Sequence, residues 1–247
     1  MATYKHDSVT PFKQEKSSKK EQVAKMFDGI AFKYDFLNRF LSVGIDIRWR
    51  KKAIRQLKEI NPQKILDVAT GTADLALMAY KMLQPKSIIG IDISEGMLEK
   101  GRRKIMEANL QSVIELQQGD SEAINFPDAS FDAVMVAFGV RNFSDLEKGL
   151  TEMHRVLKPN GKLVILECSE PETPIIKNFY HLYTHIIVPK AGQWFANNKE
   201  AYQYLNNSVE AFPKGEDFLN IMKKIGFNEV YRKPLSLGIC TIYCGKK

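Results

Sequence analysis

The sequence predicts an α/β protein built on an open, mostly parallel sheet. Residues 65–92 are the main evidence. They begin with an apolar run, which indicates a strand, and turn at 70–73. A stretch rich in Ala, Leu and Met then indicates a helix, and a second apolar run indicates the next strand. Such a unit forms two parallel strands joined by a right-handed crossover. The same alternation continues to residue 166, and apolar segments at 227–231 and 238–244 predict a closing pair of strands.

The alternation of strands and helices between residues 92 and 227 predicts the other elements of the sheet. Ser94 is a suitable N-cap for the helix that precedes the third strand. Pro159 should end another helix, and Gly161 should supply the unusual backbone angle of the turn before the fifth strand. The total is a sheet of seven strands with helices on both faces. The third, fourth and fifth strands are expected at 113–118, 131–138 and 162–166.

Two parts of the chain fall outside the alternation. Residues 1–20 are polar and lysine-rich and predict a flexible basic tail, whereas residues 21–62 show helical spacing but precede the sheet and predict a cap over a ligand site. The main domain is then 63–247, with a helical insertion at 171–212 after the fifth strand. The many aromatic residues of this insertion suit a flat or apolar substrate with a long tail, and a subdomain with its own small core would have the same composition.

Several classes of protein are disfavoured by composition. No run approaches the roughly 20 apolar residues of a membrane-spanning helix, no secretory signal is visible, and three cysteines are too few and dispersed for a disulfide framework or zinc site. His181 and His185 lack the acid of an HExxH motif, so no metal is expected. We therefore expect a cytoplasmic protein. Its formal net charge of +7 indicates a solvated surface or weak attraction to anionic membrane, and no nucleic-acid-binding signature accompanies it.

Acidic residues end the first two strands of the predicted sheet. Asp67 lies in the first strand and Asp92 ends the second, about 20 residues later, where a carboxylate can accept both hydroxyls of a ribose. The turn between them has one glycine, Gly71, instead of the GxGxxG pattern that binds a pyrophosphate. Asp67 would repel a pyrophosphate and attract a cation. S-adenosylmethionine fits, because it has a ribose, an ammonium and a sulfonium but no phosphate.

Two further groups follow strand ends. Asp120 comes after the third strand, where its carboxylate could accept a hydrogen bond from the exocyclic amine of adenine or could simply form a turn. Arg141 and Asn142 follow the fourth strand, which should lie beside the first. A substrate should meet the cofactor at that edge of the sheet.

Specific motifs give the chain a family resemblance from about residue 23 onward. It closely resembles the quinone C-methyltransferases of menaquinone and ubiquinone biosynthesis, within the Rossmann-like class I methyltransferases that use S-adenosylmethionine. The motifs are Tyr34-Asp35-x-x-Asn38, Ser42-x-Gly44, Trp49, Leu66-Asp67-x-Ala69-x-Gly71-Thr72, Phe138-Gly139-x-Arg141-Asn142 and Arg155-Val156-Leu157-Lys158-Pro159.

The resemblance implies roles for the cofactor residues. Gly71 and Thr72 would face the amino-acid portion of S-adenosylmethionine, and Asp92 would bind its ribose. Asp120 and Ser121 would hold the adenine.

The resemblance also implies an acceptor. The reaction would methylate a ring carbon of demethylmenaquinol, with Arg141 stabilising the phenolate directly or through a water, Asn142 positioning that region and Tyr34 binding the quinol. A benzoquinol of the ubiquinone pathway, a soluble small acceptor and a non-catalytic nucleoside-binding module are the alternatives. A prenylated substrate implies weak peripheral contact with the inner face of the cytoplasmic membrane, through the basic N-terminal region and the aromatic insertion. A homodimer is the alternative to a monomer.

Overall fold

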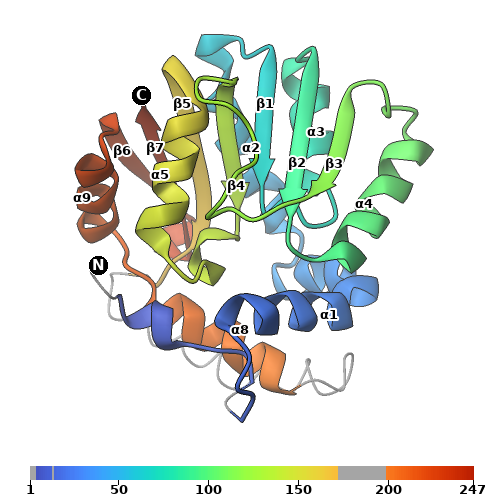
Figure 1. The fold of residues 1–247 in the computed structure, drawn as a ribbon, viewed down its shortest axis with the longest axis vertical. Helices are drawn as coiled ribbons and strands as arrows, with labels where there is room; N and C mark the ends of the chain where they lie inside the picture. The colour runs from blue at the N-terminus through green and yellow to red at the C-terminus, as the bar shows by residue number, and fades with distance from the viewer. Residues whose placement is uncertain (1–3, 13, 172–198) are drawn as a thin grey trace.

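The computed structural model describes residues 4–12, 14–171 and 199–247, and in this part of the chain seven strands form one sheet (Figure 1). The strand order is β3-β2-β1-β4-β5-β7-β6. Strands β1 to β5 are parallel, and β7 is antiparallel to both of its neighbours. This confirms the predicted Rossmann-like sheet. Its strands are β1 (Lys64–Val68), β2 (Ser87–Asp92), β3 (Ile114–Gln118), β4 (Phe131–Ala137), β5 (Leu157–Cys168), β6 (Asn228–Leu235) and β7 (Cys240–Lys246).

Helices cover both faces of the sheet, because alternate residues of the strands point to opposite faces and both sets are apolar. In β1, Leu66 and Val68 pack with α5 (Leu146–Val156) and α9 (Glu216–Ile225). Ile65 packs on the other face. Complete burial of each such side chain contributes about 1.5–3 kcal/mol. The helices on that other face are α2 (Ile45–Arg55), α3 (Asp74–Leu83) and α4 (Glu95–Glu107).

Two helices lie beyond the carboxyl ends of the strands instead of on a face of the sheet: α1 (Lys19–Leu41) and α8 (Lys199–Ala211) (Figure 1). They share a third apolar cluster in which Met26 of α1, Met97 of α4 and Tyr204 of α8 are all buried. The segment 21–62 therefore divides between two positions. Helix α1 covers the strand ends, whereas α2 packs on the sheet, because its Trp49 and Ile54 are buried with the sheet residues.

The N-terminal residues differ from the flexible tail expected for residues 1–20. Residues 5–8 form the short helix η1 (Lys5–Ser8), and the imidazole of His6 is fully buried against the ring of Phe212. The hydroxyl of Tyr4 donates a hydrogen bond to Glu147 at 2.5 Å. The polar composition of the segment predicted flexibility, but the rings of Tyr4 and His6 pack onto the domain.

The turn before the central part of β5 also differs from expectation. Asn160, and not Gly161, has the left-handed backbone conformation, with φ of 64°. Asparagine tolerates this conformation better than most side chains. Gly161 is required for space, since an added Cβ would lie 2.8 Å from the carbonyl oxygen of Lys158. The other described short helices are η2 (Lys58–Ile60), η3 (Val140–Asn142) and η5 (Ser236–Gly238).

Candidate active site

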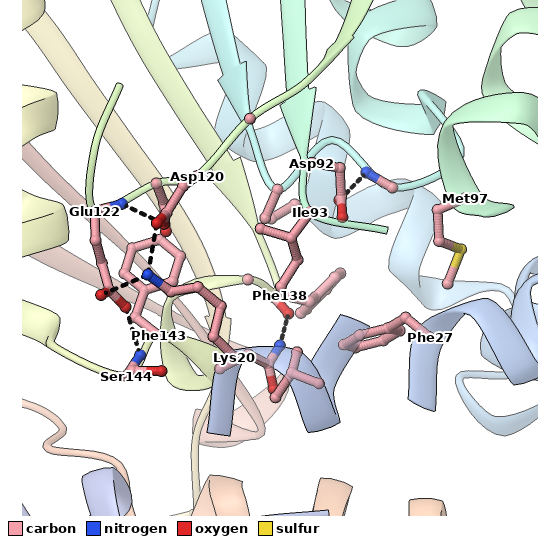
Figure 2. A pocket seen from close by; sticks show the side chains of 18 of the residues that line it. Lys20, Phe27, Asp92, Ile93, Met97, Asp120, Glu122, Phe138, Phe143 and Ser144 are labelled. Carbon is pink, nitrogen blue, oxygen red and sulfur yellow. Dashed lines mark hydrogen bonds and ion pairs between the residues drawn. The ribbon is translucent and has the colours of Figure 1, made fainter. Parts of the chain in front are cut away.

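A pocket of about 660 Å³ lies between α1 and the carboxyl ends of β1 to β4 (Figure 2). This is the edge at which open α/β sheets bind ligands, and the empty volume of the pocket includes its opening to solvent. Acidic groups from the strand ends form one side, and apolar side chains from α1 and α4 form the other. Described residues of its wall include Lys20, Val23, Phe27, Tyr34, Ala69, Gly71, Asp92, Ile93, Met97, Gly119, Asp120, Ser121, Glu122, Phe138, Gly139, Asn142 and Phe143.

The turn after β1 forms the floor of the pocket. Ala69, Gly71 and Ala73 all have positive φ, of 52°, 56° and 63°. This conformation is uncommon for alanine and is typical of turns at functional sites. The turn after β4 comes so close that a Cβ on Gly139 would lie 2.6 Å from the Cβ of Ala69. The small residues of both turns thus leave backbone, instead of side chains, facing the pocket.

Asp92 is held by the backbone on both sides. Its Oδ2 accepts a hydrogen bond from the N–H of Gly71 at 2.8 Å, and its Oδ1 accepts one from the N–H of Ser94 at 2.9 Å. Each carboxylate oxygen can accept a second hydrogen bond, so two ribose hydroxyls can still bind. Burial raises the pKa of Asp92 to about 6, although the hydrogen bonds from Ser94 and Gly71 lower it.

Asp120 and Ser121 line the pocket beyond β3, together with two charged residues that the sequence analysis did not assign to the site. Lys20 of α1 reaches Asp120 at 2.5 Å and Glu122 at 3.0 Å, as Figure 2 shows. Asp120 also accepts a hydrogen bond from the N–H of Glu122 at 2.9 Å. Glu122 in turn accepts from the N–H of Ser144 at 2.7 Å. The loop after β3 is therefore tied both to α1 and to the loop after β4.

Asp67 and Thr72 lie beside the main pocket, in a smaller one of about 330 Å³ that shares Tyr34 and Gly71 with it. Asp67 accepts a hydrogen bond from Thr70 at 2.7 Å. Its other oxygen is buried without a hydrogen-bond partner among the described residues, and burial raises the pKa of Asp67 to about 7. An ammonium group would satisfy this oxygen. The hydroxyl of Thr72 instead donates to Asp35 of α1 at 2.6 Å.

Arg141 is buried behind the pocket and is not part of its described wall. Its guanidinium is 2.5 Å from the fully buried carboxylate of Glu167 and donates to the carbonyl of Phe138 at 2.8 Å. Despite its burial, the charge of Glu167 raises the pKa of Arg141, so the guanidinium stays protonated. Its Nε has no hydrogen-bond partner among the described residues. One N–H of a fixed cation thus remains able to donate.

Asn142 and Tyr34 both line the main pocket, Asn142 from η3 and Tyr34 from α1. The side-chain oxygen of Asn142 accepts a hydrogen bond from the hydroxyl of Tyr204 in α8 at 3.1 Å. Burial raises the pKa of Tyr34, which keeps its phenol neutral and able to donate. The structure therefore brings Tyr34, Asn142, Asp92 and Asp120 around one pocket, with Asp67 in the adjoining one and Arg141 outside the described wall.

The sequence analysis missed Lys20, Glu122 and Glu167 as members of this site. Lys20 appeared only as part of the basic N-terminal run. Glu122 directly follows Asp120-Ser121, and Glu167 directly follows the predicted fifth strand, so their position at strand ends was the signal that could have marked them. The sequence analysis assigned no role to Asp35 of the tyrosine–aspartate motif, and in the structure Asp35 contacts the turn after β1. Each of these side chains is defined by a partner far away in the sequence.

The described residues contain no cluster of three or more His, Cys, Asp or Glu side chains arranged to hold a metal. His181 and His185 lie outside the described ranges. In the described part of the chain, no helix is both long and apolar enough to cross a membrane.

Comparison with known proteins decides the family. The family model described as the ubiE/COQ5 methyltransferase family matches residues 14–247. The chain belongs to this family. A Bacteroides fragilis protein named demethylmenaquinone methyltransferase is 46% identical over 244 residues, which cover 99% of both proteins. A Geobacter sp. (strain M21) protein named ubiquinone/menaquinone biosynthesis C-methyltransferase UbiE is 46% identical over 232 residues, covering 94% of this chain and 98% of the relative.

Solved structures confirm the fold at much lower identity. A Thermotoga maritima S-adenosylmethionine-dependent methyltransferase has a TM-score of 0.61 at 18% identity, with 91% of this chain and 99% of that chain covered. Phosphoethanolamine N-methyltransferase 2 of Haemonchus contortus, in complex with S-adenosylmethionine, has a TM-score of 0.58 at 16% identity, with 80% and 52% covered. This member of the ubiE/COQ5 family is accordingly an S-adenosylmethionine-dependent methyltransferase.

Proposed function

We propose that this methyltransferase converts demethylmenaquinol to menaquinol by methylating a carbon of the quinol ring. The observation that carries the proposal is the 46% identity, over 99% of both chains, to a relative named for this activity. The pocket supports it, since Phe27, Phe138 and Phe143 offer an apolar wall for a flat ring. When bound, S-adenosylmethionine supplies an electrophilic methyl group on its sulfonium.

The proposed cofactor residues form a series along the strand ends. Asp92 accepts the ribose hydroxyls, and Asp120 with Ser121 holds the adenine. The turn at Gly71 lets the amino-acid portion approach the backbone, with Asp67 accepting its ammonium. The unpartnered buried oxygen of Asp67 supports this assignment, because an isolated buried polar atom is costly unless a ligand satisfies it. Thr72 contributes by positioning the turn, since its hydroxyl is bonded to Asp35.

The proposed acceptor residues promote attack by a ring carbon that is weakly nucleophilic until the quinol loses a phenolic proton to solvent water. The phenolate then places negative charge on the neighbouring ring carbon. That carbon would take the methyl group as S-adenosylhomocysteine leaves, and loss of the proton on that carbon to water would restore the aromatic ring. Arg141 stabilises the phenolate through its remaining N–H, directly or through a water, in a buried setting where electrostatic interactions are strong. Asn142 and Tyr34, which both line the pocket, orient the ring.

The test of the proposed function uses S-adenosylmethionine with a labelled methyl group. The label is offered under reducing conditions with demethylmenaquinol and, separately, with a demethylated benzoquinol of the same tail. We expect label in the naphthoquinol. Label in the benzoquinol alone would assign the enzyme to the ubiquinone pathway, and label in neither, with cofactor binding intact, would overturn a quinol as the acceptor.

The role of Arg141 has its own test. Arg141→Ala should lower kcat by 100-fold or more, the loss typical of removing a group that stabilises developing charge, and should change cofactor affinity little. Equal losses in turnover and cofactor affinity would contradict the role. The more conservative Arg141→Lys keeps the positive charge but loses the fork of N–H groups. It therefore separates the contribution of the charge to turnover from that of the hydrogen-bond geometry.

The prenyl tail of such a substrate resides in a membrane, and the proposal includes peripheral contact with an anionic inner leaflet. The net charge of +7 supports it, as do Phe32 and Val43, whose side chains are 90% and 88% exposed near the C-terminal end of α1. The predicted aromatic insertion lies largely outside the described residues. Liposome flotation at low salt tests the contact, with Phe32→Ser expected to weaken it; absence of binding to anionic vesicles would contradict it.

Two further expectations belong to the same proposal. The chain works on the cytoplasmic side of that membrane, where cell fractionation should recover it partly with the membrane at low ionic strength. The sequence leaves a homodimer and a monomer open, and analytical ultracentrifugation across a concentration series distinguishes them. A sedimentation coefficient of a monomer at all concentrations would exclude the dimer.

A further inference from the structure

Helix α1 carries three polar side chains on one side that contact the loops of the cofactor site. They are Lys20, Asp28 and Asp35, which are separated by eight and seven residues. At about 100° per residue, all three fall within an arc of roughly 80°. Each of them contacts a different strand-end loop of the cofactor site. This arrangement joins one helix to three loops that the sheet itself holds in place.

Lys20 contacts the loop after β3. Its ammonium is 2.5 Å from Asp120 and 3.0 Å from Glu122, and Figure 2 shows it lying between the two carboxylates. These are charge-assisted contacts at a partly buried position, where they are stronger than in open water. Both oxygens of Asp120 retain accepting capacity. Lys20 therefore leaves room for the adenine amine on the same carboxylate.

Asp28 contacts the loop after β2. Its carboxylate accepts a hydrogen bond from the hydroxyl of Ser94 at 2.6 Å and another from the N–H of Gly96 at 3.0 Å. The N–H of Ser94 is itself a donor to Asp92, at 2.9 Å. Asp28 also caps the N-terminus of α4, a favourable position for a negative charge. The position of α1 is thereby linked to the carboxylate that receives the ribose.

Asp35 contacts the turn after β1. It accepts a hydrogen bond from Thr72 at 2.6 Å and forms ion pairs with Lys104 at 2.8 Å and Lys100 at 3.0 Å, both in α4. Although burial opposes the charge, these groups hold the pKa of Asp35 below its ordinary value. Thr72 directly follows Gly71, which lines the pocket. The third contact thus fixes α1 to the turn at the amino-acid end of the site.

The same helix closes the pocket on its outer side. Val23, Phe27 and Tyr34 all line the pocket, so a ligand in it lies between α1 and the strand ends. We propose that α1 is a clamp whose three polar contacts, from Lys20, Asp28 and Asp35, must open for the cofactor to enter or leave. The inference rests on the cofactor assignment within the proposed function, and it does not depend on which acceptor is methylated.

The experiment measures association and dissociation rates of S-adenosylhomocysteine and S-adenosylmethionine by stopped flow, without an acceptor. The variants are Lys20→Ala, Asp28→Ala and Asp35→Ala, in which alanine preserves helix propensity. Each should accelerate both entry and release by about 5- to 20-fold, so that Kd changes much less than either rate. Lys20→Arg should restore slow exchange. Lys25→Ala is the matched control, because Lys25 lies in α1 and pairs only with Glu15 among the described ion pairs.

The alternatives give different rates. If the three residues were simply contacts that stabilise bound cofactor, release would accelerate and entry would not change, and the clamp would be overturned. Unchanged release in all three variants would overturn it as well. Thermal melting without cofactor checks that each variant is folded. Where the Lys20 or Asp35 variant is not, a salt titration of the wild type replaces it, since screening of their ion pairs should accelerate entry and release together. Where Asp28→Ala is not, Asp28→Asn replaces it. Acceleration of release alone would again contradict the clamp.

Discussion

The two halves of the pocket handle buried charge in opposite ways. In the cofactor half, after β1 and β2, Asp67 and Asp92 are carboxylates whose pKa values burial raises to about 7 and about 6. In the acceptor half, after β4 and β5, the buried cation Arg141 is neutralised by Glu167, which is fully buried. Arg50 lines the small pocket beside Asp67 and lowers its pKa, but Arg50 forms its ion pair with Asp46, and one oxygen of Asp67 has no hydrogen-bond partner among the described residues. The guanidinium of Arg141, by contrast, is paired directly with Glu167.

The difference shows what each half needs from a ligand. A cationic ligand completes the cofactor half, so binding energy is gained there when ammonium and hydroxyl groups meet the free accepting oxygens. The acceptor half must instead keep a fixed positive group in one position while a phenolate forms, and a buried partner holds that group still. Changes in the first half should therefore affect affinity, and changes in the second should affect stability and turnover.

The largest expected effect is on the acceptor half. Glu167→Gln removes the charge that neutralises Arg141 and leaves a buried cation, so the free energy of unfolding should fall by about 3–5 kcal/mol. Urea denaturation measures this. The control is Glu229→Gln, because Glu229 is 67% exposed in its pair with Lys246 and should contribute no more than about 1 kcal/mol. Similar losses in both variants would show that the buried pair has no special role.

The next effect is on the cofactor half. Asp92→Asn removes the charged acceptor and should weaken binding of S-adenosylmethionine by roughly 10- to 100-fold, since hydrogen bonds to charged groups contribute about 1.5–3 kcal/mol. Its stability without ligand should also fall, by about 1–3 kcal/mol, because an amide has one accepting oxygen for the two N–H groups of Gly71 and Ser94. Titration calorimetry gives the affinity. Asp128→Asn, at a side chain 76% exposed, is the control and should bind normally; an unaltered Kd in Asp92→Asn would remove Asp92 from the site.

The pKa values of the two acids sharpen the comparison further. A cationic ligand favours their charged forms, so S-adenosylmethionine should bind more tightly as the pH rises through about 6 to 7. A change of roughly tenfold between about pH 5.5 and 7.5 is expected. The stability of the free protein should change with pH in the opposite direction to cofactor affinity. The contribution of the two raised pKa values to stability is complete below about pH 4 and is lost as the pH rises through 7. Asp67→Asn should flatten the upper part of the binding curve, and an unaltered curve would contradict the assignment.

The smallest effect concerns the support of Asn142. Tyr204→Phe removes a hydrogen bond of 3.1 Å and should cost about 1 kcal/mol of stability, with a few-fold loss of turnover and no change in cofactor Kd. Tyr231→Phe is the control, because its hydroxyl donates to Gln56 on a remote part of the surface. A loss of cofactor affinity in Tyr204→Phe would mean that the two halves are not separable in this way.

The sequence by itself determined the sheet, the helices on its faces and the acids at its strand ends. Apolar periodicity marked the strands, and Ser94 marked a helix start that the structure confirms by a hydrogen bond to the N–H of Met97. Asp67, Asp92 and Asp120 were found because each follows or ends a strand, which is local information. The turn at Asn160 shows the limit of such reasoning. The unusual backbone angle was predicted for Gly161, and the structure has the positive φ at Asn160.

Only the tertiary structure decided which charges meet. Lys20 and Asp120 are separated by 100 residues, and Arg141 and Glu167 by 26. The local sequence around a charged side chain does not show whether that side chain is solvated or paired, because its partner is fixed by the packing of distant elements. The same reason applies to the N-terminal segment, where the burial of His6 depends on Phe212. Periodicity encodes which face of an element is buried, and packing alone selects what lies against that face.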